Sequence, residues 1–162
     1  GFNFKTDELF DPDYARYQEA LGADQEIKVI HLVRKNLLDQ YISHQVVLNQ
    51  TGVTLLHSNE VAPEIRPFTC DITHAIAYFE DVAQRELLSE KFYAGHRSIS
   101  VSYEGLQEKS SGDREAIQKF LGVTIKTLAS ATKKIIRDNR ELLNNLDETL
   151  SALSNAGFAD RI

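Results

Sequence analysis

The stretch Lys28–Gln50, KVIHLVRKNLLDQYISHQVVLNQ, decides the fold that the sequence predicts. Its short apolar run, Val29–Val33, is rich in β-branched residues, and such runs are typical of buried strands. Arg34 and Lys35 follow this run directly. Asn36 is a favourable N-cap, and the apolar residues after it recur with the spacing of an amphipathic helix. The stretch therefore predicts a strand, a cationic corner and a helix in succession.

The predicted corner has the chemistry of an anion-binding site. In an open parallel sheet, ligands bind at the carboxyl ends of the strands. A helix N-terminus favours an anion at that place, and the two cations Arg34 and Lys35 strengthen the preference. Ser43 lies about two turns along the predicted helix, on the face that carries Asn36. We expect Arg34 or Lys35 to hold one side of a phosphate and the Ser43 hydroxyl to bond another of its oxygens.

This stretch resembles the 3′-phosphate-binding segment of sulfotransferases that use 3′-phosphoadenosine 5′-phosphosulfate (PAPS). In that family a strand ends in Arg, and a Ser follows eight residues later on the next helix. Counting back eight residues from Ser43 gives Lys35, and bacterial lipopolysaccharide- and nodulation-type members often have LVRRN at this corner. Lys35 thus stands where the family has Arg. Lys keeps the charge but loses bidentate geometry, so the resemblance leaves Arg34 and Lys35 as alternatives for the phosphate contact.

Further segments agree with the family in residue type and order. Residues 2–5 resemble its GFK-containing strand, and Ser98–Leu106 resembles its V-x-YE-D-L element, with Gly105 where Asp is common. Residues 113–123, DREAIQKFLGV, resemble the helix that follows, so the resemblance extends from Phe2 to Phe158. The family's 5′-phosphosulfate loop would precede residue 2, and the isolated glycines of this chain form no P-loop. We therefore expect an N-terminally truncated member of the family.

Composition excludes several other classes of protein. The chain has 162 residues, a formal net charge of −6 and a pI of about 5.4, which argues against a general nucleic-acid or membrane-surface binder. Its single cysteine, Cys70, excludes a disulfide framework and argues against a cysteine-based metal site. No apolar run approaches the length of a membrane span, and no signal peptide is visible. We expect a cytoplasmic protein without a metal cofactor.

The rest of the chain predicts helices, a long loop and a sheet edge. Helices are predicted over residues 11–22 and 71–94. Residues 51–71 lack any period, so they are either a loop that lines an acceptor cleft or a plain surface loop, with His57 and Glu60 as its polar candidates. The leucines near the C-terminus suit a core-facing helix or, alternatively, a dimer seam. Loss of a sheet strand by truncation would leave an apolar edge, so we expect a homo-oligomer formed through that edge.

The resemblance implies a single domain, residues 1–162, of the α/β class. The fold expected is a P-loop-nucleotide-binding-like three-layer architecture with a small parallel sheet. The activity implied is transfer of a sulfuryl group from PAPS to a hydroxyl acceptor such as a carbohydrate, with Arg34, Lys35 and Ser43 holding the donor. The alternative is a non-catalytic remnant that binds an adenosine phosphate or a protein partner. A third interpretation, a relative of the nucleotide kinases, is weakened because the chain lacks a GK[ST] loop and an evident Mg²⁺ carboxylate site.

Overall fold

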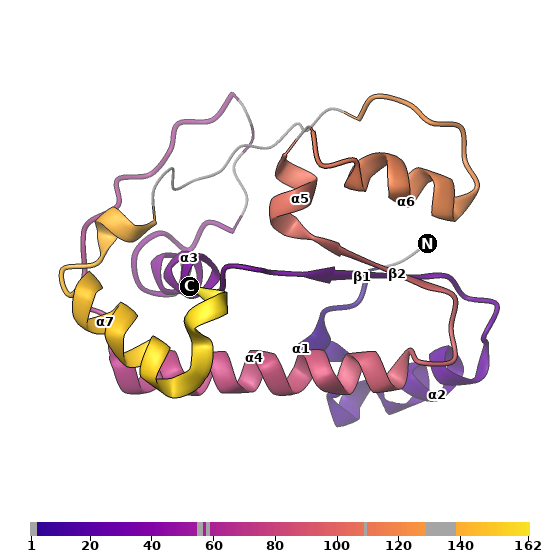
Figure 1. Ribbon diagram of the computed structural model, residues 1–162, viewed down its shortest axis with the longest axis horizontal. Coiled ribbons are helices and arrows are strands. Elements are labelled where there is room, and N and C mark those ends of the chain that lie inside the picture. Colours follow the sequence, from indigo (N-terminus) through magenta and orange to yellow (C-terminus); the bar gives the residue numbers. More distant parts are fainter. Residues whose placement is uncertain (1–2, 55–56, 58, 109, 129–138) are drawn as a thin grey trace. The chain divides into compact units, whose positions relative to one another are not determined.

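The computed structural model describes residues 3–54, 57, 59–108, 110–128 and 139–162. These residues form an α/β chain with a small, two-stranded parallel sheet (Figure 1). The chain divides into two compact units, the first made of Gly1–Val33 and Glu80–Lys126 and the second of Arg34–Phe79 and Thr127–Ile162. The expected single sulfotransferase-like domain stays a prediction.

The first unit contains the sheet and the following elements: α1 (Thr6–Leu9), the 3-10 helix η1 (Pro12–Tyr14), α2 (Ala15–Ala23), β1 (Val29–Val33), most of α4 (Ile72–Phe92), β2 (Ser98–Ser102), α5 (Tyr103–Gln107) and α6 (Asp113–Leu121). The second unit contains α3 (Leu37–Val46), the π-helix η2 (Val47–Thr51), the start of α4, the 3-10 helix η3 (Arg140–Leu142), α7 (Leu146–Leu153), the π-helix η4 (Ser154–Phe158) and the 3-10 helix η5 (Ala159–Arg161).

Strands β1 and β2 pair in parallel, from Val29 opposite Ser98 to Val33 opposite Ser102 (Figure 1). The strand predicted over Val29–Val33 is confirmed, and the segment Ser98–Ser102 forms its partner. The prediction that β1 is a buried strand is wrong, because Ile30 is 38% exposed and Leu32 is 53% exposed. Within the described residues β1 has a single neighbouring strand, so its apolar side chains receive less cover than those of a central strand.

The strand predicted over residues 2–5 is also wrong for residues 3–5, which form no strand in the structure. Lys5 instead starts helix α1. Its carbonyl accepts the Leu9 N–H at 2.9 Å, and its own N–H donates to the Glu8 carboxylate at 3.1 Å. Local capping hydrogen bonds at Lys5 therefore favour a helix where the resemblance suggested a strand. The helices predicted over residues 11–22 and 71–94 are confirmed as η1 with α2 and as α4.

The turn after β2 leaves no room for a side chain at Gly105. The Ser102 hydroxyl accepts the Gly105 N–H at 3.0 Å and caps helix α5. A Cβ at position 105 would collide with the carboxylate of Asp113, from the first turn of α6. A carboxylate therefore fills this place from another helix, and glycine is the residue that leaves room for it.

Helix α3 supplies most of the core of the second unit. The Asn36 side chain accepts the Asp39 N–H at 2.8 Å, so the predicted N-cap is confirmed. The predicted apolar face of α3 is buried: Leu37, Leu38, Tyr41, Ile42 and Val46. Leu143 and Leu153 are buried as well, which favours core packing over a dimer seam for the C-terminal leucines.

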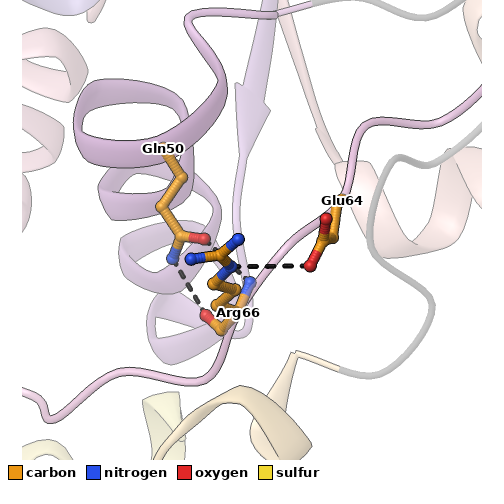
Figure 2. Close-up of polar contacts among 3 residues, drawn as sticks. All are labelled: Gln50, Glu64 and Arg66. Atoms are coloured by element: carbon orange, nitrogen blue, oxygen red, sulfur yellow. Dashed lines mark hydrogen bonds and ion pairs between the residues drawn. The ribbon is translucent and has the colours of Figure 1, made fainter.

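The loop after α3 is irregular, as predicted, but it is tied down at several points. Its start follows Gly52, whose φ of 64° suits a residue without a side chain. The Gln50 amide donates to the Arg66 carbonyl at 3.0 Å and accepts the Arg66 N–H at 2.8 Å, while Arg66 pairs with Glu64 (Figure 2). Further along, Phe68 forms an isolated parallel bridge with Leu143.

Candidate functional site

The candidate site is the cationic corner at the start of α3, in the second unit. Arg34 and Lys35 directly precede the N-cap Asn36 in the chain, with Arg34 half-buried and Lys35 exposed. Asn36 caps the third amide of α3, so the first amides of the helix are the ones that remain for an anion. The positive end of the helix dipole adds to the two side-chain charges. The acidic Asp39 also lies in this first turn and competes for the same field.

Arg161 adds a third cation that the sequence did not reveal. Its guanidinium donates to the carbonyl of Arg34 at 2.7 Å and to the carbonyl of Lys35 at 3.3 Å. Guanidinium binding to these two carbonyls offsets the negative ends of their dipoles at a place where an anion would meet them. Arg161 stands 127 residues from Arg34 in the chain, in the short helix η5, and no local pattern connects the two positions.

Ser43 lies farther along α3, about 9 Å from Leu37 along the helix axis at the usual rise per residue. Its hydroxyl is half-buried and accepts a hydrogen bond from Asn139 Nδ2 at 3.3 Å. The same Nδ2 donates to the Asp39 carbonyl at 2.8 Å. The structure therefore joins Ser43 to Asn139, a residue that the sequence analysis did not select. Lys133 and Lys134, which precede Asn139 in the chain, lie outside the described residues.

A second polar cluster surrounds Cys70 in the core of the second unit. Cys70 is buried, and the side chains of Tyr41 and Thr149 lie beside its thiol. Burial raises the pKa of the Cys70 thiol, which keeps it in the weakly nucleophilic protonated form. The Asn145 amide accepts the Cys70 N–H at 2.8 Å and donates to the Cys70 carbonyl at 3.1 Å. These contacts support the interpretation of Cys70 as a small buried residue.

The histidines have partners that the sequence did not reveal. His74 Nδ1 lies 3.1 Å from the Tyr41 hydroxyl, and His96 Nε2 lies 2.8 Å from the Leu21 carbonyl. The exposed His44 ring stacks on Tyr78, with centroids 5.7 Å apart. His31, predicted as a core histidine, is half-buried on β1. Each of these contacts is explained by packing, and none of the four rings identifies a general base.

Across the described ranges, no three His, Cys, Asp or Glu side chains gather closely enough to hold a metal ion. None of the helices in those ranges combines the length and the apolar character needed to cross a membrane.

Comparison with known proteins adds no relative to this picture. No protein-family model matches the chain, and neither a curated protein nor a solved structure shows significant similarity to it.

Proposed function

We propose that the chain is a sulfotransferase-like domain that holds PAPS by the 3′-phosphate of its adenosine. The observation that carries the proposal is the corner itself, where Arg34 and Lys35 directly precede the N-capped helix α3. Ser43 on the same helix and Arg161 on the corner carbonyls support it. The proposed architecture is that of a P-loop-nucleotide-binding fold, and the proposed location is the reducing interior of a cell.

In the proposed reaction, an acceptor hydroxyl attacks the sulfur of PAPS. A new O–S bond forms, the S–O bond to the 5′-phosphate breaks, and the acceptor proton passes to a general base. The products are a sulfate ester, for example of a carbohydrate, and adenosine 3′,5′-bisphosphate. The contribution of the corner is to anchor the donor remotely from the reacting sulfur, which supplies binding energy for alignment.

The second candidate is a non-catalytic relative that binds an adenosine phosphate or a protein partner without turnover. Binding without sulfate-ester formation from PAPS, with a simple sugar as acceptor, would support this candidate. Formation of adenosine 3′,5′-bisphosphate that depends on the acceptor would support the transferase.

The test of the site is calorimetric titration with adenosine 3′,5′-bisphosphate at low salt. Each charge-assisted hydrogen bond contributes about 1.5–3 kcal/mol, so Lys35→Ala and Ser43→Ala should each weaken binding roughly tenfold or more. Comparison of the affinity lost in Arg34→Ala with that lost in Lys35→Ala shows which of the two cations makes the main phosphate contact. Lys119→Ala is the matched control, because Lys119 is an exposed lysine of α6 that pairs with Glu115. Absence of binding, or an equal loss in Lys119→Ala, would contradict the proposal.

We also propose that the chain forms homo-oligomers through its sheet. The exposed side chains of Ile30 and Leu32 on β1 support this, since an apolar strand with one open edge favours pairing with another chain.

A further inference from the structure

Asn139 is a buried polar residue of the second unit with an unsatisfied hydrogen-bond acceptor. It is 3% exposed, and its Nδ2 makes both of the hydrogen bonds to α3 described above. Its Oδ1 is shielded from solvent and has no hydrogen-bond partner among the described residues. The two contacts of Nδ2 determine the orientation of the amide, because the Asp39 carbonyl can only accept. A buried acceptor without a donor is costly, and its persistence in a folded chain calls for an explanation.

The first consequence of this geometry concerns the Ser43 hydroxyl. A serine inside a helix commonly donates its hydroxyl hydrogen to the carbonyl four residues earlier, which here belongs to Asp39. Asn139 Nδ2 already occupies that carbonyl at 2.8 Å and also donates to Ser43 Oγ at 3.3 Å. The hydroxyl of Ser43 therefore accepts from Asn139, and its own hydrogen is available to donate to a ligand oxygen. This is the state that an anionic oxygen requires.

The second consequence concerns Oδ1. It belongs to the same amide group whose Nδ2 bonds Ser43, so a ligand oxygen held by Ser43 brings its neighbouring groups close to Oδ1. In a ribonucleoside 3′-phosphate, the atom next to the phosphate-bearing carbon carries the 2′-hydroxyl, which is a hydrogen-bond donor. The Ser43 hydroxyl can donate a hydrogen bond to such a phosphate, and Asn139 Oδ1 can accept one from the 2′-hydroxyl.

We infer that Asn139 orients the Ser43 hydroxyl toward the 3′-phosphate and selects ribose over deoxyribose by accepting the 2′-hydroxyl. The inference rests on the proposed function and names the sugar that the site prefers. The amide must open toward the ligand as it binds, because Oδ1 is shielded in the structure described.

The test compares the affinity of the full chain for adenosine 3′,5′-bisphosphate with its affinity for the 2′-deoxy counterpart. The variants are Asn139→Leu, Ser43→Ala and the double variant. Leu has the size of Asn and removes the unpartnered acceptor together with the donor, so the fold should be retained. Gln50→Leu is the matched control, since it removes an amide that pairs with the backbone of the same unit at an exposed place (Figure 2).

The wild-type chain should prefer the ribonucleotide roughly tenfold, the effect of one hydrogen bond to a buried acceptor. Asn139→Leu should lose that preference and also bind the deoxy ligand more weakly. Ser43→Ala should weaken the binding of both ligands by the same factor and keep the preference for the ribonucleotide. The double variant should bind no more weakly than Asn139→Leu, and Gln50→Leu should bind as the wild type does.

Equal affinity of the wild type for the two ligands would overturn the inference and leave the proposed function standing. The same holds if Asn139→Leu keeps the wild-type affinities. A wild-type chain that binds neither ligand would overturn the proposed function together with the inference. The wild-type comparison alone decides the sugar preference if circular dichroism shows that Asn139→Leu does not fold.

Discussion

At the scale of single residues, Tyr41 and Cys70 are the titratable groups most affected by the fold. Burial raises the pKa of the Tyr41 phenol above its ordinary value of 10.0 and that of the Cys70 thiol above 9.0. The interaction of Tyr41 with Cys70 raises the phenol pKa further. Both groups are therefore neutral in the folded chain at pH values where the unfolded chain has begun to lose their protons.

The direction of these shifts predicts a loss of stability in alkali. Above about pH 9 the folded chain binds more protons than the unfolded chain, so the free energy of unfolding should fall as the pH rises. Below that pH these two groups do not make the free energy of unfolding depend on pH. Tyr41→Phe should flatten the fall between about pH 10 and 11, and it should cost about 1 kcal/mol at pH 7 through loss of the bond to His74.

Urea unfolding of the two chains, followed at pH 7 and at several values up to pH 11, measures this slope. Tyr17→Phe is the control, because Tyr17 is 60% exposed and its ring should leave the slope unchanged. An identical alkaline slope in Tyr41→Phe and the wild type would contradict the assignment.

At the scale of elements, side-chain amides brace segments that lie outside the helices and strands. Gln118 of α6 donates to the Lys126 carbonyl at 3.1 Å and accepts the Lys126 N–H at 2.7 Å. Asn145 braces Cys70 and Gln50 braces Arg66 in the same two-bond manner. Each amide satisfies one donor and one acceptor of an extended segment, as a neighbouring strand would.

Burial should decide how much each of these amide–backbone pairs contributes to the free energy of unfolding. Gln118 is 7% exposed, so Gln118→Ala leaves the Lys126 N–H and carbonyl without their partner and should cost about 1–3 kcal/mol. The exposed Gln50 pair can be replaced by water, so Gln50→Ala should cost less than about 0.5 kcal/mol. Thermal unfolding gives both values, and hydrogen exchange at Lys126 should accelerate only in Gln118→Ala. Equal costs for the two variants would show that burial does not set the strength of the braces.

At the scale of the whole molecule, the proposed self-association is open to direct measurement. Light scattering at micromolar concentration should give a mass above that of the 18.3 kDa chain. Leu32→Lys places a charge on the exposed apolar face of β1 and should shift the chain toward the monomer. Leu128→Lys is the control, since it changes an equally exposed leucine outside the sheet. A monomeric wild-type chain would contradict the proposal.

The sequence by itself determined the local elements around the corner. Three features were predicted correctly: the apolar run of β1, the Asn36 cap and the apolar face of α3. Each depends on residues within a few positions of one another, so the local sequence is enough to predict it. The same local reasoning was wrong at residues 3–5, where capping of α1 prevailed, and at the burial of β1, which depends on how many strands surround it.

Only the tertiary structure decided which distant groups complete the site. Arg161 meets Arg34 from 127 positions away, and Asn139 meets Ser43 from 96 positions away. The Tyr41–His74 and His96–Leu21 contacts likewise join residues 33 and 75 positions apart. A hydrogen bond between two polar side chains leaves no period or spacing in the sequence, because its geometry is set by the packing of the helices that carry them.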